Sequence, residues 1–157
     1  MTASARLRIV AIGNRMPGWV QAGFEEYRKR LPRDFAVELR ELALARRGAD
    51  TARAIEEEGH ALLGALAPDE LVVALEVNGQ PWSTEELAAR MRIWRDEGHR
   101  VAFLIGGPDG LSAACRERAT HCWSLSRLTL PHPLVRVVLV EQLYRAWSIL
   151  VAHPYHR

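Results

Sequence analysis

Short apolar runs that read as buried strands alternate with segments of helical spacing, and this alternation constrains the fold more than any other feature. Apolar and β-branched residues predict strands over 7–13, 35–42, 71–77, 101–105 and 122–125. The third run is expected to turn at Asn78-Gly79. Strands separated by helices are typical of an α/β fold with a mostly parallel sheet flanked by helices.

Capping and breaking residues set the bounds of the intervening helices. Ser83 followed by Glu86 forms a capping box, and Gly98 is expected to end that helix. The other predicted helices run from Pro17 to Leu31, from Asp50 or Thr51 to Leu66, after Ser112, and from about Leu134 toward the C-terminus. With neither a repeat nor a linker, the sequence predicts a single domain over residues 1–157.

Size and composition place the chain among cytoplasmic globular proteins. It has 157 residues, of which 48% are hydrophobic and 25% charged. The sequence has neither a signal-peptide layout nor an apolar run of the roughly 18 residues that a membrane helix requires. Cys115 and Cys122 form neither a CxxC pair nor a ligand cluster, which favours a reducing cytosol. We therefore expect a cytoplasmic protein with no membrane partner.

Charge is divided unevenly along the chain although the net charge is only +2. Residues 1–53 carry 11 Lys/Arg against 6 Asp/Glu, residues 54–110 carry 4 against 11, and residues 111–157 carry 6 against 2. All the basic residues except Lys29 are arginine. Arginine suits bidentate phosphate contacts, although genome composition gives the same bias. The basic ends form a phosphate-facing surface if the fold brings them together.

A glycine-rich loop, residues 106–112, is the strongest local signal for a ligand. It directly follows the apolar run that ends at Ile105 and precedes a predicted helix. Ligands of open α/β sheets bind at the carboxyl ends of strands, where glycines let them approach the backbone. The loop is neither GxGxxG nor a GK[ST] phosphate loop, so a nucleotide phosphate is not indicated. The alternative is a tight turn that needs glycine for its backbone angles.

A proline-flanked histidine, His132, lies in a stiff apolar segment over residues 124–136. Pro131 and Pro133 restrict the loop, which suits it to enclose a flat heterocycle. His132 is a candidate general base or RNA-contacting group, or else it anchors the loop. Arg136, about one turn into the last helix, meets either a phosphate or a carboxylate.

The C-terminal tail concentrates His153, Tyr155, His156 and Arg157 without any acidic residue. This composition fits stacking on RNA and contact with its phosphates. His153 and His156 lie three residues apart, but no third ligand has suitable spacing, so we expect no metal. By contrast, the run Glu56-Glu57-Glu58 is interpreted as a solvated helix face.

Taken together, these motifs resemble the ribosomal RNA large subunit methyltransferase H family of SPOUT-class enzymes. The resemblance rests on residues 104–110, 123–136 and 144–157, and extends to residues 10–13 with Met16-Pro17 and to residues 79–82, in the same order along the chain. It implies an α/β fold whose C-terminal part forms a deep trefoil knot, which the general rule against knots would not have suggested. It also implies a homodimer that binds S-adenosylmethionine in the knot.

The activity that the resemblance implies is methyl transfer to N3 of a pseudouridine in the helix-69 loop of 23S rRNA, on assembled ribosomes and without DNA as a partner. By matching motif, the cofactor pocket comprises Leu75, Gly107, Leu125, Ser126, Arg127, Leu128, Thr129 and Leu130. The RNA-facing or catalytic positions are His132, Arg136, Tyr155, His156 and Arg157. The resemblance further suggests that the tail completes a site across the dimer interface.

Two other classes of function remain open from the residues themselves. A binding module that takes up S-adenosylmethionine or a nucleotide and regulates ribosome assembly would share the pocket without transferring a methyl group. A metal-dependent hydrolase would use His132, His153 and His156. Labelled methyl transfer and metal analysis distinguish these classes from a methyltransferase.

Overall fold

The computed structural model describes residues 6–48 and 50–157 and contains a five-stranded sheet in the order β2-β1-β4-β3-β5. Every neighbouring pair is parallel, so the sheet is all-parallel rather than mostly parallel. The strands are β1 (Arg6–Ile12), β2 (Val37–Leu42), β3 (Leu71–Pro81), β4 (Arg100–Ile105) and β5 (His121–Ser124).

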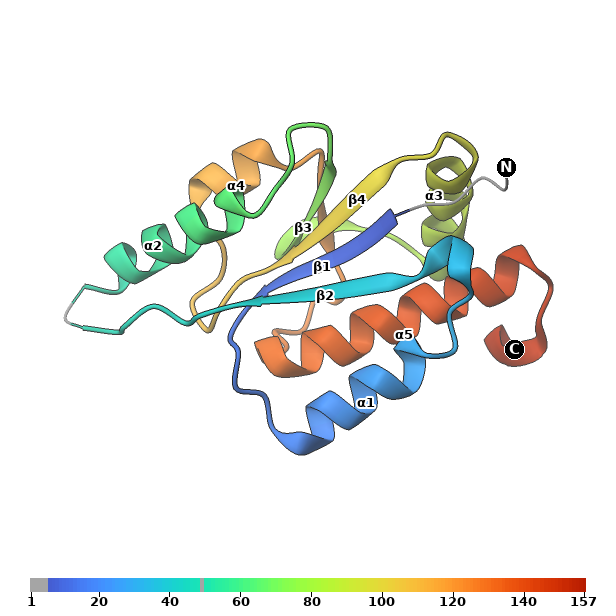
Figure 1. The fold of residues 1–157 in the computed structure, drawn as a ribbon, viewed down its shortest axis with the longest axis horizontal. Helices are drawn as coiled ribbons and strands as arrows, with labels where there is room; N and C mark the ends of the chain where they lie inside the picture. Colours follow the sequence, from blue (N-terminus) through green and yellow to red (C-terminus); the bar gives the residue numbers. More distant parts are fainter. Residues whose placement is uncertain (1–5, 49) are drawn as a thin grey trace.

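Helices cover both faces of the sheet, as the alternation predicted (Figure 1). On one face α5 packs against α1 and α3, and on the other α2 packs against α4. The bounds are α1 (Gly18–Arg28), α2 (Thr51–Gly64), α3 (Thr84–Asp96), α4 (Ala113–Arg118) and α5 (His132–Leu150), with 3-10 turns η1 (Arg33–Phe35) and η2 (Pro154–His156).

Alternate residues along each strand supply two separate cores. In β1, Leu7 and Ile9 enter the larger core beneath α1, α3 and α5, whereas Val10 and Ile12 enter the smaller core beneath α2 and α4. Because side chains of a strand point alternately to opposite faces, a continuous apolar run means burial on both sides. This pattern explains why the strands were readable from the sequence.

Capping residues and glycines predicted most of the helix ends correctly. Ser83 and Glu86 form the predicted capping box, and the side chain of Asp50 accepts a hydrogen bond from the Arg53 amide. Gly98 follows α3 with a φ of 68°, a left-handed conformation that suits glycine. The helix α5 begins at His132, two residues before the predicted start, because Pro133 fits the first turn of a helix.

The predicted turn at Asn78-Gly79 is wrong. Extended structure continues to Pro81, and Leu75 and Gln80 both pair with Trp123, so the register shifts between them. A Cβ on Gly79 would lie 2.6 Å from the carbonyl oxygen of Cys122. This glycine therefore permits a close approach of β3 to β5 rather than a hairpin turn. The strand predicted over residues 35–42 also starts later than expected. Phe35 belongs to η1, and β2 starts at Val37.

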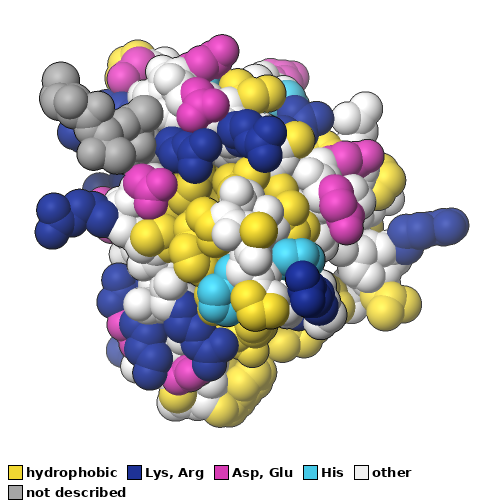
Figure 2. All heavy atoms as spheres, turned by 90° about the vertical axis from the view of Figure 1, so that its right-hand side faces the viewer, with side chains coloured by type: hydrophobic (Ala, Val, Ile, Leu, Met, Phe, Trp, Pro, Cys, Tyr) yellow, Lys and Arg dark blue, Asp and Glu magenta, His cyan; other side chains and the backbone are white. Residues whose placement is uncertain are grey.

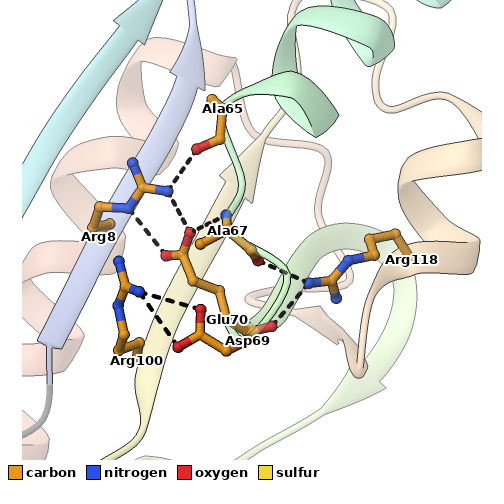
Figure 3. Close-up of polar contacts among 7 residues, drawn as sticks. All are labelled: Arg8, Ala65, Ala67, Asp69, Glu70, Arg100 and Arg118. Carbon is orange, nitrogen blue, oxygen red and sulfur yellow. Dashed lines mark hydrogen bonds and ion pairs between the residues drawn. The ribbon is translucent and has the colours of Figure 1, made fainter.

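At the amino ends of the strands, arginines hold the chain that links α2 to β3 (Figure 3). Glu70 is buried and accepts hydrogen bonds from Arg8 and from the Ala67 amide. Arg118 donates to the Glu70 carbonyl at 3.0 Å, and Arg100 pairs with Asp69 at 3.2 Å. Some of the many arginines of this chain therefore stabilise the fold rather than bind a ligand.

Within the described part of the chain, none of the helices has the length and apolar character needed to span a membrane.

Candidate functional site

A cavity of about 570 Å³ opens at the carboxyl ends of β4 and β5, beside residues 75–77 of β3. Three segments form its wall: residues 75–77 within β3, the glycine loop after β4, and the segment between β5 and α5 together with the start of α5. Seven of the eight residues predicted for the cofactor pocket line it, namely Leu75, Gly107, Leu125, Ser126, Leu128, Thr129 and Leu130. Segments that lie 50 residues apart in the sequence thus meet around one hollow.

Close backbone approach explains why the loop after β4 is rich in glycine. A Cβ on Gly106 would lie 2.7 Å from the backbone carbon and oxygen of Gly110. Gly110 itself has a φ of 85°, and Gly107 and Gly110 pair as an isolated bridge. The loop therefore folds back on itself and presents its backbone to the cavity, so the turn interpretation and the ligand interpretation both apply.

A buried ion pair supports this loop from behind. Glu58 is only 2% exposed and accepts hydrogen bonds from Arg47 and from the Ala45 amide. Arg47 also reaches Asp109 in the loop at 3.0 Å. The prediction that Glu58 belongs to a solvated face is wrong, because the helix α2 turns this side chain toward the segment after β2. No local sequence rule predicts this pairing, because it joins α2 to the segment after β2 at a spacing of 11 residues, which is not a helical one.

The segment between β5 and α5 is shaped by serine hydroxyls. Ser124 Oγ donates to the Ser126 carbonyl at 2.8 Å, and Ser126 Oγ accepts from the Leu128 amide at 2.9 Å. Leu128 is 72% exposed although it lines the cavity. Arg127 is the predicted pocket residue that does not line the cavity; its side chain is exposed to solvent.

His132, the first residue of α5, lines this cavity and a second one beside it. Its Nδ1 is buried and has no hydrogen-bond partner among the described residues. Burial and the nearby positive charge of Arg136 lower the pKa of the imidazole. At neutral pH the ring is therefore uncharged and able to accept a proton or a hydrogen bond.

Arg136 takes the carboxylate alternative rather than the phosphate one in this structure. Its side chain is 1% exposed, pairs with Glu41 at 2.5 Å and donates to the carbonyl oxygens of Ile12 and Gly13. The guanidinium thereby ties the start of α5 to the loop after β1. The guanidinium lies within the protein rather than at a surface open to RNA.

The tail folds back along the end of α5, away from the cavity (Figure 1). Tyr155 donates to Glu141 at 3.1 Å and packs against Tyr144, with ring centroids 4.5 Å apart. His156 lies 3.3 Å from the hydroxyl of Ser148, and Arg157 is exposed. Glu141 and Ser148 lie nine and sixteen residues after His132 in α5, so the groups bound to them lie about 14 Å and 24 Å from His132 along the helix axis. One chain does not bring all five predicted positions together.

Sequence reasoning missed Glu76, a carboxylate in the cavity wall. Its Oε1 is buried and has no hydrogen-bond partner in the described part of the chain, with the Arg116 guanidinium at 3.5 Å. The signal available was its position directly after Leu75, at the end of an apolar strand. Among the described residues, His, Cys, Asp and Glu form no group of three that could hold a metal ion.

Comparisons with known proteins agree with this fold. A family profile described as "Predicted SPOUT methyltransferase" matches residues 5–156. A crystal structure of a probable methyltransferase from Bordetella pertussis Tohama I superposes with a TM-score of 0.57 at 20% identity, covering 90% of this chain and 96% of that one. A probable methylase family protein from Haemophilus influenzae Rd KW20 gives 0.57 at 12% identity, over 96% of this chain and 70% of that one. The chain is of the SPOUT methyltransferase class.

Relatives with more than half of their residues identical identify the family within this class. Ribosomal RNA large subunit methyltransferase H of Chromohalobacter salexigens is 58% identical over 154 residues, covering 97% of this chain and 99% of that protein. The proteins of the same name from Hahella chejuensis and Marinomonas sp. are 55% and 53% identical over the same shares. The chain belongs to the ribosomal RNA large subunit methyltransferase H family.

Proposed function

We propose that this protein transfers the methyl group of S-adenosylmethionine to N3 of a pseudouridine in the helix-69 loop of 23S rRNA, acting on assembled ribosomes in the cytoplasm. The carrying observation is the cavity at the carboxyl ends of β4 and β5, which gathers seven of the eight pocket residues implied by the family resemblance. Relatives named as ribosomal RNA methyltransferases, similar over nearly the whole chain, support the substrate class.

The cavity fits an S-adenosylmethionine-sized molecule. Its volume of about 570 Å³ lies within the usual range of roughly 300–1,000 Å³ for small-molecule sites. Leucine side chains offer apolar contact to a flat ring, while the backbone of Gly107 and the Leu125–Leu130 segment offers hydrogen bonds. The carboxylate of Glu76, whose Oε1 pairs with Arg116 at 3.5 Å, is suited to accept from a hydroxyl or an ammonium group of the ligand. S-adenosylmethionine supplies an activated methyl group on a sulfonium, so the protein does not have to activate the donor.

In the proposed reaction, the lone pair of pseudouridine N3 forms the new N–C bond while the C–S bond breaks and its electrons return to sulfur. N3 carries an imino proton, which must leave before or during the attack. His132, uncharged at neutral pH and in the wall of the cavity, is the group proposed to accept it. Positioning of the two reactants is the largest contribution expected of the protein.

The tail requires a second chain. Tyr155 and His156 pack beside Glu141 and Ser148, about 14 Å and 24 Å along α5 from His132 of the same chain, so a site containing His132 and the whole tail needs the tail of a partner protomer. Figure 2 shows the side of the molecule that carries the tail, where hydrophobic side chains gather among arginine and histidine side chains. Such a mixed surface suits both a homodimer contact and RNA phosphates. Arg157 is the exposed cation proposed to hold phosphate.

The remaining role of Arg136 in this proposal is positional, because its guanidinium is committed to Glu41 and to two backbone carbonyls. We also propose that residues 1–157 form one knotted SPOUT domain. In support, β5 lies at the edge of the sheet beyond β3, yet α5, which follows it, packs against both α1 and α3. The chain therefore crosses the carboxyl edge of the sheet between residues 125 and 131.

Transfer of labelled methyl from S-adenosylmethionine to assembled ribosomes, compared with protein-free rRNA, tests the function. We expect labelling of ribosomes only, mapped to N3 of a pseudouridine in the helix-69 loop. Labelling of free RNA alone would move the target elsewhere. No labelling of either, with cofactor binding measurable by calorimetry, would contradict the enzyme and favour a binding module.

A further inference from the structure

A second cavity, of about 520 Å³, opens on the same edge of the sheet as the cofactor cavity. Three segments line it: the loop after β1 (residues 13–17), Ala43 and Leu44 after β2, and His132 with Pro133 at the start of α5. Within the described part of the chain, His132 is the residue common to the walls of both cavities. A molecule in the second cavity would thus meet the cofactor cavity at His132.

We infer that this second cavity receives the pyrimidine ring that is methylated, and that Asn14 and Arg15 hold the target nucleotide there. The inference rests on the proposed function, and it assigns the substrate side of the site to the loop after β1. It explains why Gly13, Met16 and Pro17 belong to the family pattern although none of them lines the cofactor cavity.

The loop after β1 is rigid enough to hold a ligand. Gly13 has a φ of 109°, and its carbonyl accepts a hydrogen bond from the buried Arg136 at 2.5 Å. The Met16 carbonyl accepts from the side-chain amide of Gln21 at 2.9 Å. Both ends of the loop are therefore tied to helices, through Arg136 in α5 and Gln21 in α1. A preorganised loop loses little conformational entropy when a ligand binds.

Between those two ties, the polar side chains of the loop are free to meet a ligand. Asn14 and Arg15 are exposed, and neither side chain makes a hydrogen bond or ion pair within residues 6–48 and 50–157. A primary amide offers both a donor and an acceptor, which complements the alternating carbonyl and N–H groups of a uracil-type ring. The guanidinium of Arg15 is suited to the adjoining phosphate.

The rest of the wall suits the faces of a flat ring and the charge that develops on it. Met16, Pro17 and Leu44 contribute apolar surface. The amino end of α5 has neither a side-chain cap nor an acidic residue in its first turn. Its free N–H groups and helix dipole favour the negative charge that a ring imide acquires as it loses its proton.

Two kinds of variant test the assignment with ribosomes as substrate. Asn14→Ala and Arg15→Ala each remove one polar contact, for which we expect KM for ribosomes to rise about fivefold to tenfold while the affinity for S-adenosylmethionine stays unchanged. Ala43→Trp fills the cavity from an exposed position and should abolish methylation with cofactor binding intact. Matched controls are Arg92→Ala and Ala89→Trp, both at exposed positions of α3.

The outcomes separate this inference from the function on which it rests. Unchanged methylation kinetics in Asn14→Ala, Arg15→Ala and Ala43→Trp, beside an active unmodified protein, would overturn the inference and leave the function standing. Loss of cofactor binding in all three would also overturn it, because the loop would then support the cofactor cavity instead. An unmodified protein that methylates neither ribosomes nor rRNA would overturn the function itself.

Discussion

At the scale of single residues, the proposed acid–base chemistry depends on His132. Its pKa is lowered from the ordinary value of 6.5 by burial and by the charge of Arg136, so the ring becomes protonated only below that pH. A protonated imidazole cannot accept the N3 proton. We expect the single-turnover methylation rate to stay level from pH 8 to about 6.5 and to fall in more acidic buffer.

His132→Asn should lower the single-turnover rate by about 10²- to 10⁴-fold and remove the acidic fall from the pH profile. Calorimetric binding of S-adenosylmethionine serves as the control, because an asparagine keeps a polar group at the cavity wall. A variant with the full rate would show that another group, or water, takes the proton.

The contacts of Arg136 within the protein indicate a structural role, although its charge alone suggests a phosphate contact. Arg136→Met would leave Glu41 and the carbonyl oxygens of Ile12 and Gly13 without their donor. Unsatisfied buried acceptors cost about 1–3 kcal/mol, so the free energy of unfolding in urea should fall by that amount. Arg92→Met, at an exposed position, should change it by less than about 0.5 kcal/mol. Normal stability with lost ribosome affinity would instead support a phosphate contact.

At the scale of elements, the connection from α2 to β3 depends on the ionised state of Glu70. Burial would raise the pKa of this carboxyl, but hydrogen bonds from Arg8 and from the Ala67 amide outweigh it and the pKa is lowered. A carboxyl with a lowered pKa in the folded state stabilises the fold above its unfolded pKa of about 4.5, and this contribution is lost as pH falls further.

Glu70→Gln should therefore lower the free energy of unfolding by about 1–3 kcal/mol at pH 7 and flatten its decline below pH 4.5. Urea unfolding at a series of pH values measures both effects. Glu85→Gln, at an exposed position of α3, is the matched control. An unchanged slope in acid would mean that Glu70 is not the titrating group that matters there.

The glycine loop after β4 has no room for a side chain at Gly106. Gly106→Ala would place a Cβ 2.7 Å from the Gly110 backbone, so the loop must move and its hydrogen bonds to the ligand be lost. We expect the affinity for S-adenosylmethionine to fall at least about tenfold, the equivalent of 1.4 kcal/mol. Gly64→Ala at the end of α2, where no atom lies within 4 Å, should leave binding unchanged. Equal binding by both variants would exclude this loop from the pocket.

At the scale of the whole molecule, the proposed site joins His132 of one protomer to the tail of its partner. Deletion of residues 153–157 should spare cofactor binding and abolish methylation. Coexpression of the deletion with His132→Asn gives mixed dimers in which one of the two sites keeps both an intact cavity and an intact tail. Random pairing predicts recovery of about a quarter of the normal activity. Recovery of none would contradict a shared site.

Elements and their ends were predictable where a local rule applied. The capping box at Ser83, the apolar run of β4 and the glycine after α3 each act within a few residues, so the sequence around them suffices. Gly79 was misread because the same residue type serves a tight turn or a close approach of strands. Only the position of Cys122 on the neighbouring strand distinguishes these two uses.

Family resemblance located the cofactor pocket, whereas the partners of charged residues could not be predicted. Glu58 and Glu76 look alike in the sequence, yet Glu58 supports the glycine loop through Arg47, whereas Glu76 lines the cavity and pairs with Arg116. These pairings join different elements at no regular spacing, so spacing along the sequence carries no information about them.

The sequence by itself determined the alternation of strands and helices, the two-sided burial of the strands and the motifs of the family, because each depends on residue type and short-range spacing. Only the tertiary structure decided that Arg136 is committed to Glu41, that His132 stands between two cavities, and that the tail packs against α5 rather than beside His132. Those facts depend on which strand ends meet at one edge of the sheet, and long-range packing alone fixes that arrangement.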